Sequence, residues 1–403
     1  MLGARRSLST CIEGRLAIGV ALLLSGCATA PQSAPSSEPT PTGTQPPIVS
    51  AAPSSLPTVT PSATSSAAGA GDLLLVTTFA GSHLAIVDPE AGEVGRVEVG
   101  RAPWGVAVAP DGLAWVATYD GVAVVDVGER ERVALVPYAS ERAAEPTTGE
   151  YRSGGLGIAV SPDGFRAYVG VTTRFPDPGV LEVIDTASAS VIASVPVGIR
   201  QFDVVVSADG AEIYAINHDS FDITVVDADT LQVRRTLRAA PLGDELGLRS
   251  WNKPHYAALT PDGTLLMAYK GVLLLELDPR SGETTTTELR SSTHSQGVEQ
   301  TPDGRLLLVV GDGPDDTSLG APALEIVDLA AETSVVVPLA GSHNDAAVSS
   351  DGRFAYLTGG SSREGAPHPD VVTVVDLGTG TVVESFPVSG NPLIIARWRP
   401  RGG

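Results

Sequence analysis

The sequence predicts an all-β protein, a seven-bladed β-propeller with four antiparallel strands in each blade. Two short motifs recur along its 403 residues: a tight turn of the form Ser/Thr-Pro-Asp-Gly, and a pair of apolar residues followed by Asp. Successive turn glycines lie 41 to 53 residues apart. A period of about 40–50 residues built from short β-rich runs is typical of propeller blades.

The turn motif is expected to join the first and second strands of each blade. Pro at its second position presets φ at about −65°, and Gly at its fourth position tolerates a positive φ. A degenerate last copy, Arg399–Gly402, follows six clearer ones. Those six are Ala109–Gly112, Ser161–Gly164, Ser207–Gly210, Thr260–Gly263, Thr301–Gly304 and Ser349–Gly352.

The second motif is expected to end the third strand of each blade. An Asp at that position can cap the turn that follows through its backbone amides. Seven copies end in Asp88, Asp126, Asp185, Asp227, Asp278, Asp328 and Asp376, and in the copy before Asp278 Glu276 replaces the first apolar residue. Because the two motifs interleave and occur in equal number, each supports the repeat assignment independently.

The order of the strands predicts how the ring closes. The repeats begin with a second strand at 73–79 and end with a first strand at 393–399. An open stack of sheets would leave two apolar faces exposed. The C-terminal strand should therefore join the N-terminal blade, so that 71–403 forms one closed propeller.

These motifs together resemble the YVTN-type (YncE-like) β-propeller repeat family. The family unit is Pro-x-Gly-x-Ala-Val-Ser-Pro-Asp-Gly followed by a Tyr-Val-Thr-Asn strand, and Pro103–Gly112 is similar to it. The resemblance covers 71–403 and implies the same fold. Seven-bladed relatives in this style include lactonases and the heavy chains of amine dehydrogenases, so the resemblance implies no single activity.

The first 26 residues are expected to be a signal peptide. Arg5, Arg6 and Arg15 supply positive charge, and 16–24 is an apolar run of nine residues. A bilayer-spanning helix needs about 20 residues, whereas a run of this length suits the core of an export signal.

Leu24-Ser25-Gly26-Cys27 resembles the lipobox of bacterial lipoproteins. The resemblance implies cleavage before Cys27, acylation of that cysteine and anchorage at the extracytoplasmic face of a bacterial membrane. The alternative is an ordinary signal peptide with a chance cysteine. Residues 27–70 follow as a stalk rich in Pro, Ser, Thr and Ala, a composition that cannot bury enough apolar surface to fold.

Charge and cysteine content exclude several partners. A net charge of −21 argues against nucleic acid, because binding phosphates needs a basic surface. The two cysteines, Cys11 and Cys27, leave the propeller without a disulfide or a cysteine-ligated metal, and no Cys-x-x-Cys-His haem site occurs.

One face of the predicted ring carries the variable loops. The long insertions at 138–154, 238–253, 312–320 and 359–369 all join second to third strands or one blade to the next. Long loops on a rigid scaffold commonly hold function. All six histidines are expected on this face as well, a distribution that the crowding of polar residues into loops also explains.

A polar cluster is expected near the loop-side mouth of the central channel, from four neighbouring blades. Its members are Asp203, His255, His294, Glu299, His343, Asn344 and Asp345. Three interpretations remain open: a hydrated polar funnel, a small-ligand site without metal, and a divalent-metal site. If the site is catalytic, Glu299, Asp345 and His343 are the acid–base candidates.

These observations favour a cell-envelope lipoprotein whose propeller is a binding or scaffold domain for a protein, a glycan or a small ligand. The alternative is an enzyme or redox partner, either a lactonase-like hydrolase or a protein similar to the amine-dehydrogenase heavy chain. The sequence holds no nucleophile elbow, P-loop or dinucleotide fingerprint. Asp312–Asp316 lacks the EF-hand spacing, and we expect no cofactor unless the channel holds a divalent metal.

Overall fold

The computed structural model describes 71–143, 149–243, 252–271, 273–293, 296–313, 320–362 and 367–400. All of these residues belong to one compact unit, Ala63–Gly403. The expected signal peptide, Cys27 and the stalk lie outside the described residues, as do His294 and parts of the four insertions. No helix in the described ranges is long and apolar enough to span a membrane.

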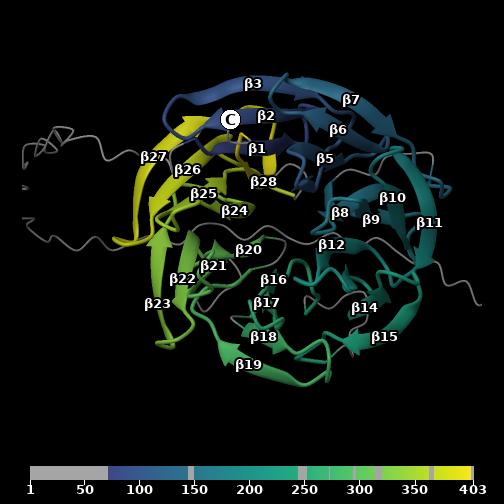
Figure 1. Ribbon diagram of the computed structural model, residues 1–403. Helices are drawn as coiled ribbons and strands as arrows, with labels where there is room; N and C mark the ends of the chain where they lie inside the picture. Colours follow the sequence, from purple (N-terminus) through teal and green to yellow (C-terminus); the bar gives the residue numbers. More distant parts are fainter. Residues whose placement is uncertain are drawn as a thin grey trace, which may run out of the picture. The chain divides into compact units, whose positions relative to one another are not determined.

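Seven antiparallel sheets of four strands form a ring, which confirms the predicted propeller (Figure 1). From the centre outward, the first blade consists of β28 (Pro392–Trp398), β1 (Leu73–Thr78), β2 (His83–Asp88) and β3 (Gly92–Glu98). The second consists of β4 (Val106–Val108), β5 (Leu113–Ala117), β6 (Val122–Asp126) and β7 (Glu131–Val136). The third consists of β8 (Gly154–Val160), β9 (Arg166–Thr172), β10 (Val180–Asp185) and β11 (Ser190–Pro196), preceded by the 3₁₀ turn η1 (Gly149–Tyr151).

The remaining four blades follow the same order. The fourth consists of β12 (Gln201–Val206), β13 (Glu212–Asn217), β14 (Asp222–Asp227) and β15 (Val233–Arg238). The fifth consists of β16 (Ala258–Leu259), β17 (Leu265–Tyr269), β18 (Leu273–Leu277) and β19 (Thr284–Glu288). The sixth consists of β20 (Val298–Gln300), β21 (Leu306–Asp312), β22 (Pro322–Asp328) and β23 (Thr333–Pro338). The seventh consists of β24 (Asp345–Val348), β25 (Phe354–Thr358), β26 (Val371–Asp376) and β27 (Thr381–Pro387).

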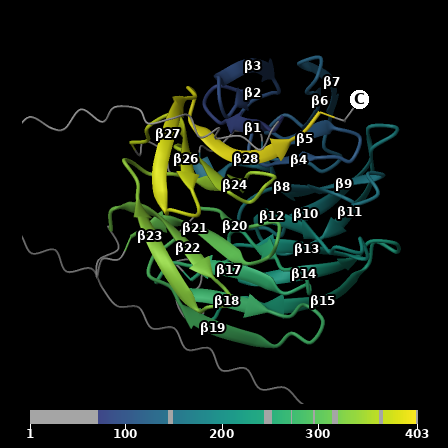
Figure 2. The same cartoon turned by 60° about the vertical axis from the view of Figure 1, so that its left-hand side comes forward.

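The C-terminal strand closes the ring as the strand order predicted. β28 pairs antiparallel with β1, with Leu75 opposite Ala396 and Val76 opposite Ile395. In the turned view it lies between β1 and β24 of the seventh blade (Figure 2). The first blade therefore takes strands from both ends of the propeller.

Both repeated motifs have the expected roles. The glycines of the six turns have φ between 72° and 92°, the region that Gly adopts without strain. Each of the seven Asp residues accepts a backbone N–H from the turn after its strand. The turn prolines also join blades: a Cβ on Gly164 would lie 3.2 Å from Cδ of Pro110 in the preceding blade.

The apolar core lies between adjacent sheets rather than in one central mass. Trp115 and Val124 of the second blade pack with Val169 and Ile184 of the third, and equivalent clusters fill the other junctions. The middle strands are buried along most of their length, whereas outer strands such as β11 alternate exposed and less exposed residues. This packing holds the seven inner strands around a common channel.

Candidate functional site

A cavity of about 330 Å³ lies in the central channel, and every blade contributes to its wall. The wall is mainly aliphatic and glycine-rich, and its acidic side chains are Asp203, Glu299 and Asp345. They come from the inner strands β12, β20 and β24. The structure thus brings together three of the seven residues that the sequence placed at the channel.

Asp203 and Asp345 occupy equivalent positions in their blades, seven residues before the turn glycines Gly210 and Gly352. The inner strand of each preceding blade has Gly at the same position, Gly157 and Gly297. A Cβ on Gly157 would lie 2.5 Å from Cα of Asp203. Glycine therefore lets neighbouring inner strands approach closely at both aspartates.

Each aspartate links its blade to the next. Asp203 Oδ2 accepts the N–H of Ala257 at 3.1 Å, and Asp345 Oδ2 accepts the N–H of Ile395 at 3.1 Å. These contacts join the fourth blade to the fifth and the seventh to the first. Both aspartates therefore have a structural role in addition to facing the cavity.

Glu299 differs from the two aspartates, since its carboxyl makes no hydrogen bond with any other described residue. Arg397 of β28 is near enough to lower the pKa of Glu299, but it forms no ion pair within the described part of the chain. The Nη1 atom of Arg397 is buried without a hydrogen-bond partner. Glu299 is thus the carboxyl in the channel that is available to a ligand.

Burial raises the pKa of all three carboxyls. The pKa of Asp203 is raised to about 6 and that of Asp345 to about 7, and backbone hydrogen bonds limit both shifts. The pKa of Glu299 is raised to about 8, first by burial and then by the charge of Asp345. The side chains are half-buried, because the channel reaches them while protein surrounds them on most sides.

Aromatic side chains close the loop-side end of the cavity. Trp104 Nε1 donates to the hydroxyl of Tyr256 at 3.1 Å, although the two residues belong to blades on opposite sides of the ring. Phe202 packs edge-on against both, with ring centroids 5.8 Å and 6.2 Å away. Trp104 and Phe202 are fully buried. The cavity extends from this plug past Ala159 and Val206 toward the turn face.

A buried charged cluster lies on the loop side of the plug. Asp219 accepts Lys253 Nζ at 2.6 Å, and its second oxygen lies 2.6 Å from Arg200 Nη1. The Arg200 guanidinium lies between the rings of Tyr151 and Phe175, 4.1 Å and 4.4 Å from their centroids. This cluster ties η1 and the β9–β10 loop to the fourth blade.

The predicted histidines do not join the carboxyls. His255 packs against Phe202 and His218, with centroids 4.8 Å and 4.3 Å away, on the side of Phe202 where the charged cluster lies. His343 uses both ring nitrogens, Nδ1 with the carbonyl of Gly341 and Nε2 with Oγ1 of Thr373, each at 2.8 Å. Burial lowers the pKa of His343, which favours the neutral ring.

Asn344 and His294 complete the predicted set. Asn344 is buried, and its Nδ2 donates to the carbonyl of Leu393 at 3.4 Å, which links β24 to β28. His294 lies outside the described residues. Within the described ranges, no group of three His, Cys, Asp or Glu residues is arranged to hold a metal ion.

The chain has the propeller fold of a known enzyme subunit. A chain of hydrazine synthase from Kuenenia stuttgartiensis superposes with a TM-score of 0.57 over 72% of this chain and 88% of that one. The identity is 19%, a level at which the likeness concerns the fold alone. No family model and no curated protein matches the sequence.

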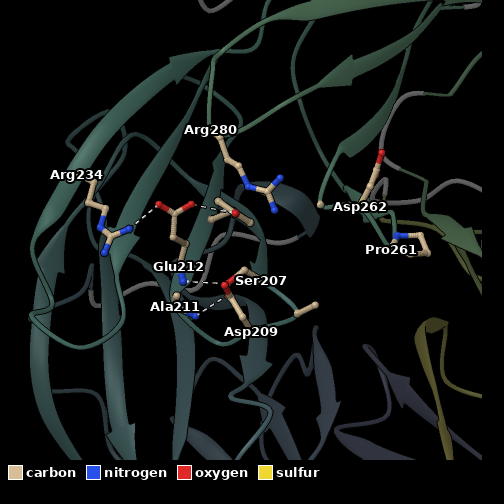
Figure 3. Close-up of a pocket in the computed structure, with 11 residues that line it drawn as sticks. Ser207, Asp209, Ala211, Glu212, Arg234, Pro261, Asp262 and Arg280 are labelled. Atoms are coloured by element: carbon tan, nitrogen blue, oxygen red, sulfur yellow. Dashed lines mark hydrogen bonds and ion pairs between the residues drawn. The ribbon is translucent and has the colours of Figure 1, made fainter.

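A second cavity of about 360 Å³ lies on the turn face between the fourth and fifth blades (Figure 3). Ala208 stands there in place of the proline found in five of the other six turns, and the smaller side chain leaves space between the blades. Glu212 accepts Arg234 and Arg235 at 2.9 Å each. Glu212 and Arg234 neutralise each other there, and Asp209 and Asp262 accept the hydroxyls of Ser207 and Thr260 within their own turns, so we assign the functional site to the channel.

Sequence reasoning missed the aromatic plug and Arg397, although a signal was present. Aligning the seven repeats on their turn glycines places Tyr256 and Ile395 at the same position as Asp203 and Asp345. Arg397 then aligns with Glu299, five residues before the turn glycine. That alignment identifies the inner-strand positions that face the channel.

Proposed function

We propose that this chain is a lipid-anchored binding protein of the cell envelope that takes a small ligand into its central channel. The channel cavity supports this most strongly. Its volume of about 330 Å³ falls in the range of small-ligand pockets, about 300–1,000 Å³. The carboxyl of Glu299 lines this cavity and has no hydrogen-bond or ion-pair partner among the described side chains.

The proposed location of the protein in the cell is based on the N-terminal sequence. The lipobox-like Leu24–Cys27 and the stalk at 27–70 support anchorage through acylated Cys27 at the extracytoplasmic face of a bacterial membrane. The repeat pattern supports membership of the YVTN-type family. The strongly acidic charge supports a partner other than nucleic acid.

Ligand capture tests the binding function. The full chain, purified in detergent, would be incubated with a small-molecule extract of the cell envelope, dialysed and weighed by native mass spectrometry. We expect an adduct of one small molecule that Glu299→Gln loses. Glu129→Gln is the matched control, since Glu129 is exposed and distant from the channel. No adduct on wild type, or an equal adduct on E299Q, would contradict a ligand site in the channel.

Acid–base catalysis is a second candidate, favoured by the spread of carboxyl pKa values. At pH 7 a carboxyl with a pKa of about 8, Glu299, is mostly protonated, whereas Asp203 with a pKa of about 6 is mostly ionised. Such a pair suits a general acid and a general base. Hydrolysis of δ-valerolactone in a pH-stat tests it: a rate above background that E299Q abolishes would support a lactonase-like enzyme.

A further inference from the structure

The channel cavity has a one-sided charge. Among its lining residues, all of them described, three carry carboxyls and none carries a cationic group. Arg397 lies nearby without forming an ion pair, so the ionised channel has a net negative charge. Charges of one sign lining a cleft with low-dielectric walls attract a ligand of the opposite sign.

The remaining wall suits a carbon skeleton. Tyr256 forms part of one end of the cavity, in front of the fully buried Trp104 and Phe202, and aliphatic side chains such as Ile394 and Val298 form much of its sides. Aromatic rings attract cations as well as apolar groups, through the negative charge on their faces. An occupant with a positive head and an apolar body would therefore find a partner for each part.

A metal ion fits this wall less well. Asp203 and Asp345 each commit one carboxylate oxygen to a backbone N–H of the next blade. Ca²⁺ takes about 6–8 oxygen ligands at about 2.3–2.6 Å. The described residues offer no cluster of three carboxylate or imidazole groups close enough for such coordination.

We propose that the channel ligand is a small organic cation, an alkyl- or arylalkylammonium whose charged group lies at Glu299 between Asp203 and Asp345. Its carbon skeleton lies against Tyr256 and the aliphatic side chains of Val298 and Ile394. The inference rests on the proposed function, since it names the class of ligand for the same channel. The ammonium enters from the turn face, because the Trp104–Tyr256 contact closes the loop side.

A matched set of probes tests this inference. 2-Phenylethylammonium, 2-phenylethanol and phenylacetate share one skeleton and differ in charge. Each would be titrated calorimetrically into the full chain at pH 9, above the raised pKa of Glu299, where the carboxyls are largely ionised. We expect the ammonium to bind at least tenfold more tightly than the alcohol and phenylacetate not to bind. E299Q should weaken the ammonium at least tenfold, and E129Q should leave it unchanged.

The possible outcomes distinguish a failure of the cation inference from a failure of the proposed binding function. If the alcohol or phenylacetate binds as tightly as the ammonium, or if the molecule captured from the envelope extract is neutral or anionic, the cation inference is overturned while channel binding stands. If no probe binds and no adduct forms, both fail. A captured molecule with a net positive charge supports the inference even if none of the three probes binds. A melting curve of E299Q that matches wild type at pH 5 excludes misfolding as the cause of lost binding.

Discussion

At the scale of single residues, the channel concentrates ionisable groups where ionisation is costly. Glu299, Asp203 and Asp345 line one cavity, and no cationic side chain is among its lining residues, all of them described. Arg397 from β28 is the charged group that partly offsets them. Carboxyls kept in such a place reduce stability, and a bound cation would restore it.

We predict that Glu299→Gln stabilises the ligand-free protein at alkaline pH. The folded-state pKa of Glu299 is raised to about 8, so its contribution to stability is complete below its unfolded pKa of 4.5 and is lost as the pH rises through 8. Gln does not ionise and escapes this loss. One pKa unit corresponds to about 1.4 kcal/mol, and because water reaches the channel we expect a gain of about 1–3 kcal/mol at pH 8.

Urea denaturation at pH 5 and pH 8 measures this effect. The difference between E299Q and wild type should shrink to less than about 1 kcal/mol at pH 5, which is only half a unit above the unfolded pKa of 4.5. Asp345, Asp203 and Arg397 are the charged groups that face Glu299, so a variant at Asp345 should shift the midpoint of the effect to lower pH. Equal stabilities at both pH values would show that Glu299 ionises without penalty.

The charged cluster on the loop side of the plug should stabilise the fold, whereas the ionised channel carboxyls destabilise it. Asp219 is buried and pairs with Lys253 and Arg200, so its removal leaves two buried cations without their carboxylate. We predict that Asp219→Asn lowers the free energy of unfolding by about 3–5 kcal/mol and leaves channel binding unchanged. The exposed Asp229→Asn is the control. A D219N protein as stable as D229N would refute a structural role for the cluster.

At the scale of elements, the blades are held together by contacts that recur at fixed positions. Turn prolines contact the turn glycine of the next blade, and channel aspartates accept N–H groups from the next inner strand. Glycine at the facing position of the preceding strand makes this approach possible. The spacing between inner strands thus depends on residues that carry no side chain.

We predict that Gly157→Ala separates the third and fourth blades. Its Cβ would lie 2.5 Å from Cα of Asp203, a backbone atom that cannot turn away. Overpacking of this kind typically costs about 1–3 kcal/mol, measurable as a lower urea midpoint. Gly128→Ala is the matched control, because the atom nearest to its Cβ would be a side-chain oxygen of Asp126 at 3.4 Å, an ordinary contact. Equal midpoints for the two variants would show that β8 and β12 can move apart freely.

At the scale of the whole molecule, the ring depends on one strand from the far end of the chain. β28 supplies the inner strand of the first blade and contacts the inner strands β24 and β4 of the blades on either side. Leu393, Ile394 and Trp398 of this strand pack into the shared cluster near the channel. Loss of β28 would expose the apolar faces of three blades at once.

We predict that deletion of 392–403 prevents cooperative folding. Each fully buried aliphatic side chain contributes about 1.5–3 kcal/mol, and the strand buries several, against a total stability of about 5–15 kcal/mol. The truncated protein should be insoluble or melt without a cooperative transition in calorimetry. Deletion of 28–70 serves as the control and should leave the melting curve unchanged. A cooperative transition in the first truncation would contradict closure by β28.

The proposed lipid anchor on Cys27 also concerns the whole molecule, because it sets where the protein is found in the cell. Acyl chains contribute about 0.8 kcal/mol for each buried CH₂, and two or more give stable anchorage. We predict that Cys27→Ala moves the protein from the membrane fraction to the soluble exported fraction, or leaves the precursor uncleaved. Fractionation and gel migration measure both results. Unchanged membrane association and size would refute lipidation at Cys27.

The repeat, the number of blades and the closure of the ring could all be predicted from local sequence patterns. Turns and caps are local: Asp185 acts on a residue three positions away, and Gly164 completes a four-residue turn. The channel carboxyls could be named as well, because an Asp or Glu in an otherwise apolar inner strand is conspicuous. Only the tertiary structure decided that His343 and Asn344 serve blade contacts and that Trp104 reaches Tyr256 across the ring. Those contacts join residues 30 to 152 positions apart. They depend on the angle at which each blade presents its inner strand to the channel, which no local pattern encodes.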